Sequence, residues 1–517
     1  MKTSSHRLHG VSCFKISWEE VHMGDFDKKL ERYLDARQPI LLIDTFEDDK
    51  AEEIIESLAK RINRSILKWS LQGFKGSRRE LKDVLASLAA DEKELEGTVL
   101  ILKDVQTTLE QPEVVSLLKY LAQQINKWVF SDDGLHEFNI IMIAPFASIP
   151  KGLECYTSIL NLDYLGEEEI RSEILHFVKE FGITEPTPEL MDRLTMTLRG
   201  LTGTEILNIL ELVIAGGNTL DATDLPLIRE QKQQMIRKSG LLEMIHVKEQ
   251  MKDIGGLEIL KDWLEKKAGI FANVKKANDF GVITPKGVLI VGMPGCGKSL
   301  AAKAASKAFD IPLLRLDMGR LMGKYVGESE GNMRRAIQLT EASSPCILWI
   351  DELEKAFAGI GTGGSEVTMR LFGNFLTWMQ EKESMVFVIA TANDITKLPP
   401  ELLRKGRFDE IFYVNLPNEK EREQIFRIHI GKKHAQDIPD IDLKSLVEKT
   451  KGYCGADIES VVHDGLEIAF LAEKDRISTE DIMEAIKTTH PISETMKDSL
   501  DKMAKNYEER KFKSASR

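Results

Sequence analysis

The feature that most constrains this chain is a glycine-rich octapeptide placed between two regular segments. The apolar run Val288-Leu289-Ile290-Val291 leads into Gly292-Met293-Pro294-Gly295-Cys296-Gly297-Lys298-Ser299, and an alanine-rich helical stretch begins at Leu300. A strand, a glycine loop and a helix in this order form the context of a phosphate-binding loop. The glycines let backbone N–H groups approach phosphate oxygens, Lys298 adds a positive charge, and the Ser299 hydroxyl can hold Mg²⁺. The alternative is an ordinary glycine-rich turn, which the flanking strand and helix disfavour.

Bulk composition narrows the class of protein. The 517 residues, 42% of them hydrophobic, are enough for two to four domains with cores. No apolar run approaches the length of a membrane span, and the first residues lack the apolar segment of a signal peptide. Five scattered cysteines without a CxxC pair favour a reducing compartment over a zinc site or a disulfide framework. The net charge of −13 disfavours a dedicated nucleic-acid binder, so we expect a cytoplasmic protein with neither membrane nor nucleic-acid partners.

Acidic residues follow the next apolar run. Cys346-Ile347-Leu348-Trp349-Ile350 is typical of a strand covered on both faces, and Asp351-Glu352 comes directly after it. Acids at the carboxyl end of such a strand lie beside the phosphate loop, where open α/β sheets bind ligands. Asp351 would then hold Mg²⁺, and Glu352 would act as general base on the attacking water. The alternative is a strand that ends in acids for solubility.

Two later motifs offer polar groups to the same site. A third apolar run, 386–390, leads into Thr391-Ala392-Asn393, where the Asn393 amide could orient the water or sense the γ-phosphate. By itself, Asn393 is typical of a helix cap or a turn. Arg404 and Arg407 lie on a short turn before the run 411–414, and they suit insertion into a neighbouring subunit's site to stabilise a transferring phosphoryl group. The alternative for such a pair is a solvated surface.

Together these motifs resemble those of the AAA clade of ring-forming ATPases, over residues 253–486. On this resemblance Asp351 and Glu352 are the Mg²⁺ and catalytic acids, Asn393 is the first sensor, and Arg404 and Arg407 are paired arginine fingers. Residues 253–257 are similar to the family's opening segment, whose backbone contacts adenine. Ile428-His429 is similar to the family's residue pair near the base and ribose, and 455–457 is similar to its second sensor. The cofactor-binding residues implied there are Ile254, Gly255, His429, Gly455 and Ala456.

The stretch Lys324-Tyr325-Val326 is similar to the first pore loop of that family, in which the aromatic residue grips a polypeptide. An exposed loop is where binding residues concentrate, although an aromatic beside a turn could also pack into a core. The resemblance implies a homo-oligomeric ring, expected to be a hexamer, that hydrolyses ATP with Mg²⁺ and threads or remodels a protein substrate. Two alternatives stay open: a slow, nucleotide-timed scaffold or regulator whose N-terminal domain recruits partners, and a nucleic-acid loader, which the acidic chain disfavours.

The first half of the chain reads as a degenerate copy of the second. The runs 40–43 and 99–102 precede 288–291 and 347–350 by 248 residues, and 140–144 precedes 386–390 by 246. Where the phosphate loop should be, the chain has acids and no glycine, and Lys103 stands in place of the metal-holding aspartate. We therefore expect this domain to fold without hydrolysing nucleotide. The alternative is an unrelated α/β domain whose strands match by pattern alone.

The predicted fold is therefore α/β: a P-loop AAA+ module, with a parallel sheet and a helical lid, preceded by a degenerate AAA-like α/β domain. The expected divisions are a degenerate domain at 1–225, a helical linker at 226–250, the large ATPase domain at 251–420, the lid at 421–490 and a basic, solvated tail at 491–517. The segments 7–10, 40–46 and 489–492 further resemble the AAA proteins encoded in algal plastid genomes and in cyanobacteria, which implies the plastid stroma for plastid relatives.

Overall fold

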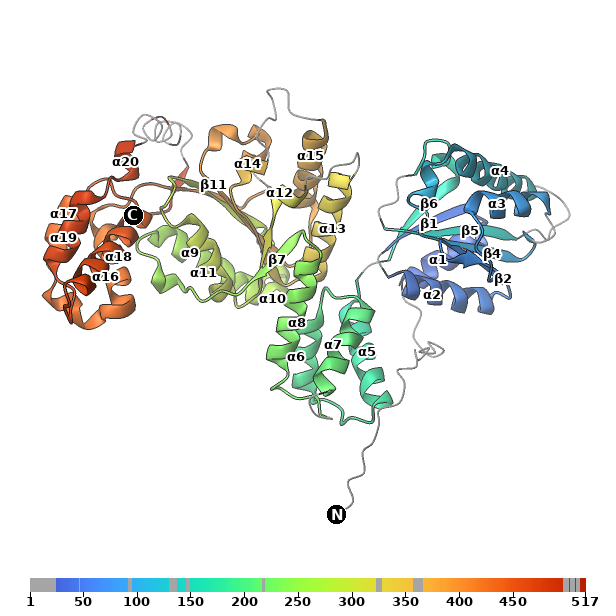
Figure 1. Ribbon diagram of the computed structural model, residues 1–517, viewed down its shortest axis with the longest axis horizontal. Helices are drawn as coiled ribbons and strands as arrows, with labels where there is room; N and C mark the ends of the chain where they lie inside the picture. Colours follow the sequence, from blue (N-terminus) through green and yellow to red (C-terminus); the bar gives the residue numbers. More distant parts are fainter. Residues whose placement is uncertain are drawn as a thin grey trace, which may run out of the picture. The chain divides into compact units, whose positions relative to one another are not determined.

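The computed structural model describes residues 25–45, 47–91, 95–129, 137–145, 149–162, 164–215, 219–321, 328–356, 366–404, 406–495, 502, 507 and 512–517. The chain forms two compact units, Met1–Asp163 and Tyr164–Arg517, each built around its own sheet (Figure 1). The mixed α/β architecture with largely parallel sheets confirms the predicted fold class. Among the described helices, none combines the length and apolar composition that a bilayer crossing needs.

The first unit is a parallel sheet with one short antiparallel edge strand, covered by helices on both faces. Alternate residues of its strands enter different cores: Leu42 packs with α3 and α4, whereas Leu41 and Ile43 pack with α1 and α2. This follows from the period of two along a strand, and it explains why the strands are continuously apolar. The elements are α1 (Asp25–Asp35), β1 (Ile40–Asp44), α2 (Asp48–Arg61), β2 (Ser65–Ser70), β3 (Gly73–Phe74), α3 (Leu81–Ala90), β4 (Thr98–Lys103), α4 (Pro112–Val129), β5 (Phe138–Ile143) and β6 (Thr157–Asn161).

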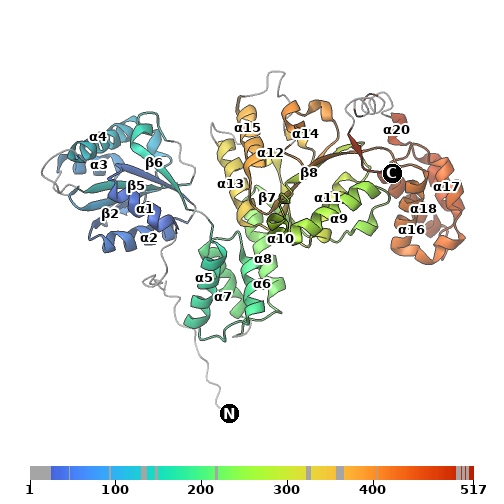
Figure 2. The same cartoon turned by 180° about the vertical axis from the view of Figure 1, so that it is seen from behind.

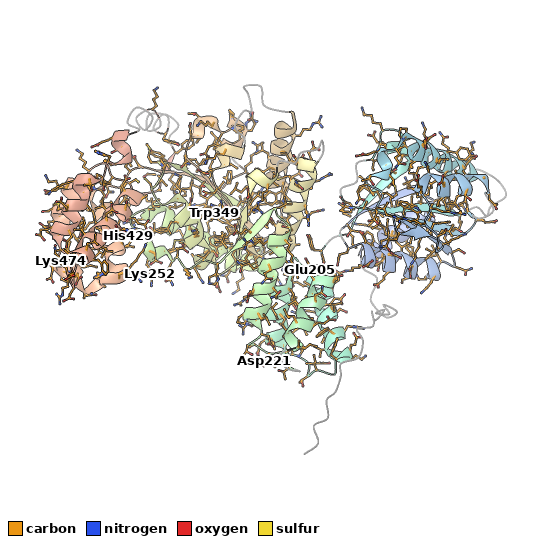
Figure 3. The ribbon with its side chains drawn as sticks, viewed as in Figure 1. Glu205, Asp221, Lys252, Trp349, His429 and Lys474 are labelled. Carbon is orange, nitrogen blue, oxygen red and sulfur yellow. The ribbon has the colours of Figure 1, made fainter. Side chains whose placement is uncertain are left out.

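The second unit begins with a helical bundle that has its own apolar core. Its helices are α5 (Glu167–Glu180), α6 (Pro188–Leu198), α7 (Gly203–Ile214) and α8 (Leu225–Lys238). A capping box starts α7, because the Glu205 backbone N–H donates to Thr202 Oγ1 and the Thr202 N–H donates to the Glu205 carboxylate. Figure 3 shows Glu205 in this bundle.

The larger part of the second unit is a seven-stranded sheet followed by a helical lid. Helices α9 and α11 cover one face, and α13 and α15 cover the other, as Figure 2 shows from behind. The sheet and its helices are β7 (Leu242–Ile245), α9 (Glu258–Ala272), α10 (Val274–Asp279), β8 (Gly287–Gly292), α11 (Lys298–Phe309), β9 (Leu313–Leu316), α12 (Met318–Leu321), α13 (Glu328–Ala342), β10 (Cys346–Ile350), α14 (Leu353–Ala356), α15 (Glu366–Glu381), β11 (Val386–Ala392), β12 (Glu410–Val414) and β13 (Lys513–Ser514). The lid consists of α16 (Glu419–His434), α17 (Leu443–Lys449), α18 (Gly455–Leu471) and α19 (Thr479–Thr488), and α20 (Ile492–Thr495) follows it.

The two sheets share one strand order. Without the edge strands β3, β7 and β13, they read β2-β4-β5-β1-β6 and β9-β10-β11-β8-β12. The register refines the repeat, because Leu100 pairs with Ile140 and Leu348 pairs with Val388. Each pair spans the same number of positions, so β5 precedes β11 by the same 248 residues as β4 precedes β10. The expected offset of 246 for this strand was wrong by two residues.

Three segments can be compared with the expected domain divisions. The first compact unit ends at Asp163, whereas the degenerate domain was expected to reach 225, and α5–α8 belong to the second unit. The segment 226–250, expected to be a helical linker, contains most of α8 and also β7: Ile228 and Ile236 are buried, and β7 pairs antiparallel with β9. The tail 491–517 is not wholly solvated, because β13 extends the sheet beside β12. In 226–250 and in the tail, apolar residues between the charged ones form a buried face, which the net charge of the segment does not reveal.

Candidate nucleotide site

A cavity of about 810 Å³ lies where the carboxyl ends of β8, β10 and β11 meet the lid. All of the sequence-predicted cofactor and acidic residues line it, although they come from segments far apart in the sequence. They are Ile254, Gly255, Pro294, Gly295, Cys296, Gly297, Lys298, Ser299, Leu300, Asp351, Glu352, Asn393, His429, Gly455 and Ala456. Parallel strands explain the convergence, because their carboxyl ends share one edge of the sheet.

The phosphate loop is shaped by two glycines in the left-handed region. Gly295 has φ +72° and Gly297 has φ +86°, and a Cβ on Gly295 would lie 2.5 Å from Cys454 Sγ of the lid. Any side chain at Gly295 would therefore strain the backbone and collide with the lid. Burial raises the pKa of the Cys296 thiol to about 12 and that of Cys454 to about 11, so both thiols stay protonated.

Lys298 is held beneath the loop. Its Nζ donates to the backbone carbonyls of Gly292 at 3.0 Å and Met293 at 2.7 Å, and its side chain is buried. Burial lowers the pKa of Lys298, which means that an anionic partner would stabilise its charged form. Helix α11 begins at this residue with neither a side-chain cap nor an acid in its first turn. Its N-terminal N–H groups and dipole therefore suit a phosphate group.

The acidic side of the cavity is tied to β11 by hydroxyl groups. Asp351 Oδ1 accepts hydrogen bonds from Ser299 Oγ, at 3.1 Å, and from Thr391 Oγ1. The Glu352 backbone N–H donates to Thr391 Oγ1 at 3.2 Å, and Glu352 has φ +51°, a conformation that costs a non-glycine residue energy. Mg²⁺ prefers oxygen ligands such as carboxylates and hydroxyl groups. Asp351 and Ser299 provide this donor set at the end of the phosphate loop, so they fit the ion.

Thr391 is the residue that sequence reasoning missed. The sequence pattern presents it only as the approach to Asn393, yet its hydroxyl bonds both to the Asp351 carboxylate and to the Glu352 backbone N–H. The available signal was a polar residue at the end of an otherwise apolar strand that neighbours the acid-bearing strand. Asn393 itself lines the cavity, and its backbone N–H donates to Glu354 Oε1 at 3.0 Å.

Glu352 also has a partner on its own turn. Lys355 Nζ lies 2.7 Å from Glu352 Oε2; the Lys355 side chain is largely exposed, and that of Glu352 is 43% exposed. Exposed ion pairs at this spacing contribute little stability. The Glu352 carboxylate can therefore leave Lys355 for another partner at little cost in free energy.

The lid closes the opposite wall. The N–H of Gly256 donates to Gln424 Oε1 at 2.8 Å, and the N–H of Leu257 donates to Glu421 Oε1 at 3.3 Å. A Cβ on Gly255 would lie 2.5 Å from the side chain of Ile425 on the lid helix α16. The close approach of this helix therefore requires glycine at position 255. At the start of α18 the Ala456 N–H donates to the Gly295 carbonyl at 3.0 Å.

His429 stands on α16 beside the large domain (Figure 3). Its Nδ1 lies 3.5 Å from Glu459 Oε1. Burial, and then the charge of Lys432, lower the pKa of His429, so the ring is neutral at pH 7. A neutral ring between the lid and the large domain suits a base or ribose better than a phosphate.

The other predicted site residues lie elsewhere. Arg404 is exposed, and the Arg407 guanidinium donates to the Glu401 carbonyl on the same turn. Neither is among the described residues that line the cavity of their own subunit. The predicted pore residues Lys324, Tyr325 and Val326 lie outside the described residues.

In the matching region of the first unit, the described residues 40–45 and 47–61 lack the features that make a phosphate site. Three residues separate β1 from α2, whereas five separate β8 from α11. Asp48 and Asp49 occupy the first turn of α2, so that helix end carries its own anions. Lys103 Nζ bridges to Asp49 at 3.1 Å and to Glu52 at 2.8 Å. Asp104 has φ +57°, as Glu352 has φ +51° at the position 248 residues later, so the strand-end turn was kept while its chemistry changed.

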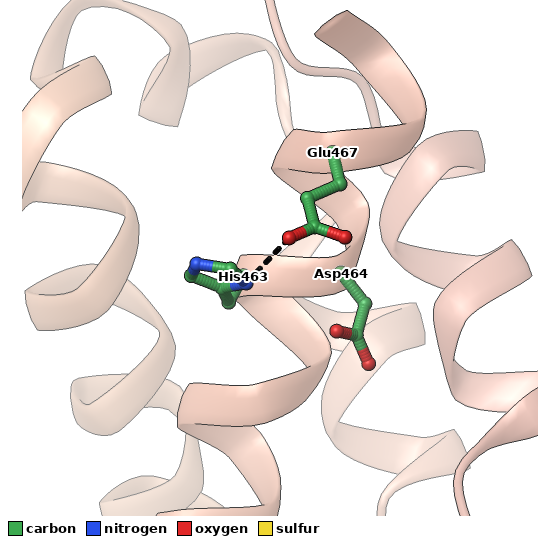
Figure 4. A group of neighbouring side chains, drawn as sticks. All are labelled: His463, Asp464 and Glu467. Atoms are coloured by element: carbon green, nitrogen blue, oxygen red, sulfur yellow. Dashed lines mark ion pairs between the residues drawn. The ribbon is translucent and has the colours of Figure 1, made fainter. Parts of the chain in front are cut away.

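A second group of potential metal ligands lies on the lid helix α18. His463, Asp464 and Glu467 approach one another on α18, and His463 Nδ1 lies 3.4 Å from Glu467 Oε1 (Figure 4). His463 and Glu467 are largely exposed and one helical turn apart. This geometry is that of a surface ion pair.

Comparison with known proteins agrees with the geometry. The family model for AAA, the ATPase family associated with various cellular activities, matches residues 288–416, and an AAA+ lid model matches 440–484. Models of the N-terminal and second domains of SpoVK-like AAA ATPases match 26–162 and 168–239. These matches cover the cavity-bearing domain, the lid, the first sheet and the helical bundle in turn.

Full-length relatives match as well. The "Uncharacterized AAA domain-containing protein ycf46" of Guillardia theta is 37% identical over 487 residues, which cover 92% of this chain and 94% of the relative. The protein of the same name from Pyropia yezoensis is 37% identical over 488 residues, covering 93% and 97%. The ATP-dependent zinc metalloprotease FtsH of Thermus thermophilus is 33% identical over 241 residues, covering 45% of this chain and 38% of that protein. The chain therefore belongs to the AAA family of ATPases, together with the ycf46 proteins of algal plastid genomes.

Proposed function

We propose that this protein is a ring-forming ATPase that remodels or threads protein substrates through a central pore. The observation that carries the proposal is the cavity in which the Lys298 loop, the acids Asp351 and Glu352, and Asn393 converge under a helical lid. Membership of the AAA family supports ATP hydrolysis as the reaction. The relative named as an ATP-dependent protease supports a polypeptide as the substrate class.

Each residue has a role that its position allows. Lys298 and the N-terminus of α11 bind the β- and γ-phosphates, while Ser299 and Asp351 hold Mg²⁺. The ion, when bound, neutralises charge on the phosphate oxygens. Glu352 takes a proton from the water that attacks the γ-phosphorus as the bond to the bridging oxygen breaks, and Asn393 orients that water.

Completion of the site requires a second copy of the chain. The described cations that line the cavity are lysines, and neither of the two predicted finger arginines lines it in its own subunit. Arg404 and Arg407 would therefore reach the γ-phosphate of a neighbouring subunit. Head-to-tail contacts of this kind close into rings, and we expect six subunits. Phe280 and Ile283 before the phosphate loop, with Phe470 and Leu471 at the end of α18, are more than three-quarters exposed and offer apolar surface for such contacts.

The pore function rests on Tyr325 and is tested by Tyr325→Ala. A threading motor should lose processing of an unfolded protein while it keeps ATP hydrolysis. The second candidate is a nucleotide-timed scaffold or regulator, which is favoured by a first unit without a phosphate site. A scaffold would keep both activities in Tyr325→Ala. Stimulation of hydrolysis by single-stranded DNA but not by unfolded protein would instead favour nucleic-acid loading.

The most informative experiment for the function traps clients on Glu352→Gln. This substitution removes the base but leaves Lys298 and the loop intact, so the variant should bind ATP, fail to hydrolyse it and retain clients from a cell extract. Normal hydrolysis by Glu352→Gln would show that Glu352 is not the base. Clients recovered equally with Lys298→Ala, which should not bind ATP, would contradict nucleotide-dependent capture. We propose a cytoplasmic location, or the stroma for plastid relatives.

A further inference from the structure

The C-terminal segment joins the catalytic sheet next to the nucleotide cavity. We call the described residues of this segment, Tyr507 and 512–517, the docked tail. Strand β13 pairs parallel with β12, with Lys513 opposite Phe412 and Ser514 opposite Tyr413, and the Ala515 N–H donates to the Tyr413 carbonyl at 2.9 Å. Ala515 is fully buried in the core that contains β8 and α11. The docked tail is therefore an edge strand of the ATPase domain.

The docked tail caps the helix that follows the base-binding segment. Helix α9 starts after Leu257, which is left-handed and provides no side-chain cap. The Ala515 carbonyl takes that place, because it accepts the N–H groups of Ile259 at 3.0 Å and Leu260 at 3.1 Å. The segment 254–257 is thus fixed by the lid on one side and by the docked tail on the other.

Ser516 continues from this contact into the cavity wall. Its backbone N–H donates to Ser514 Oγ at 3.2 Å, and Ser514 Oγ–H donates to the Ser516 carbonyl at 2.7 Å. The two bonds fix the turn that carries Ser516. The docked tail therefore forms part of the cavity wall as well as supporting it.

Tyr507 contacts the opposite part of the site. Its ring stacks on Tyr413 with centroids 4.1 Å apart, and only 2% of its surface is exposed. Its hydroxyl donates to the backbone carbonyl of Asn393 at 3.2 Å. One segment therefore touches both Asn393, which the proposed function places at the γ-phosphate, and the start of α9 beside the segment 254–257, which the family resemblance places at the base.

We propose that the docked tail is a built-in part of the nucleotide site. Ala515 and Ser516 hold and line the wall that binds the nucleoside, and Tyr507 is a positioning residue for Asn393. This inference rests on the proposed ATP hydrolysis. It predicts that the tail contributes to nucleoside binding and to turnover separately, since its two contacts lie at different parts of the cavity.

The first test removes residues 512–517 from the full chain and measures binding by calorimetry. The shortened chain should bind ADP about tenfold more weakly, because α9 loses its cap and the base-binding segment loosens. Its affinity for tripolyphosphate, which has no nucleoside, should change by less than about twofold. Asp262→Asn, which removes only the exposed ion pair to Arg517 and leaves the docked tail unchanged, is the matched control and should bind ADP normally. Unchanged ADP affinity in the shortened chain would overturn the proposal.

The second test is Tyr507→Phe, which keeps the ring and removes the hydroxyl. We expect kcat to fall about three- to tenfold while KM for ATP stays unchanged and the melting temperature falls no more than in the control variant. Tyr453→Phe is the control, because Tyr453 also donates from a buried position to a backbone carbonyl, that of Thr489, within the lid. Equal kcat in Tyr507→Phe and wild type would contradict the positioning role, and this comparison decides the question if the shortened chain does not fold. If the wild-type chain neither binds nor hydrolyses ATP, the proposed function fails instead.

Discussion

Thr391→Val should disable hydrolysis although Thr391 belongs to no motif that the sequence singled out. The Thr391 hydroxyl donates to Asp351 Oδ1 and accepts the Glu352 backbone N–H at 3.2 Å. Valine has nearly the same shape without the hydroxyl, so the substitution removes both hydrogen bonds without opening a cavity. A hydrogen bond to a charged group contributes about 1.5–3 kcal/mol. If that contribution is lost from the transition state, kcat should fall about 10- to 100-fold.

The assay is steady-state ATP hydrolysis with a separate measurement of ATP affinity. Affinity should change by less than about threefold, because Lys298 and the loop are untouched. Thr396→Val is the matched control, since its hydroxyl bonds only to Asp394 on an exposed turn, and it should retain wild-type kcat. A Thr391→Val variant that melts normally and turns over within twofold of wild type would refute the reasoning.

Three further predictions concern the trans site, assembly and a buried charge. Arg407→Ala should abolish turnover while ATP affinity stays within about twofold, and retained turnover would contradict the finger assignment. The double variant Phe470→Ser, Leu471→Ser should shift the oligomer toward smaller species in light scattering, because it removes an exposed apolar pair; an unchanged oligomer would exclude this surface. Lys232 is buried, and burial lowers its pKa from 10.5 to about 8. Between about pH 8 and 10.5 the unfolded chain therefore binds more protons than the folded chain. The free energy of unfolding of the wild type should rise with pH across that window. Lys232→Met should raise the melting temperature at pH 7 and remove most of this rise, as measured by calorimetry; a lower melting temperature would contradict the burial cost.

Much of the fold could be predicted because its strands are buried on both faces. Continuous apolar runs such as 288–291 and 347–350 leave little ambiguity, and residues at the carboxyl ends of parallel strands must meet. That rule predicts that Lys298, Asp351 and Asn393 lie together, and all three line the cavity. The sequence repeat could also be predicted. The residue offset between the copies was less certain, because apolar strands can be aligned in several registers, and the pairing of Leu100 with Ile140 fixes it.

The remainder depended on contacts that residue type does not reveal. The tail was predicted to be solvated from its basic residues, yet the small Ala515 between them is fully buried and its backbone carbonyl caps α9. Backbone caps leave no side-chain signal in a sequence. Thr391 was overlooked because a threonine in a strand is ordinary, and only its contact with Asp351 distinguishes it.

The central claim is that one ATP is hydrolysed by residues from two subunits, and mixing two inactive variants tests it most directly. Glu352→Gln lacks the proposed base but keeps both proposed fingers, and Arg407→Ala keeps the proposed base but lacks one of the two fingers. Each should be inactive alone. In a random equal mixture about a quarter of the interfaces join an intact base to an intact finger, so turnover should recover to about a quarter of the wild-type rate if the sites act independently. A mixture that stays as inactive as its components, although light scattering shows that mixed rings form, would contradict the account.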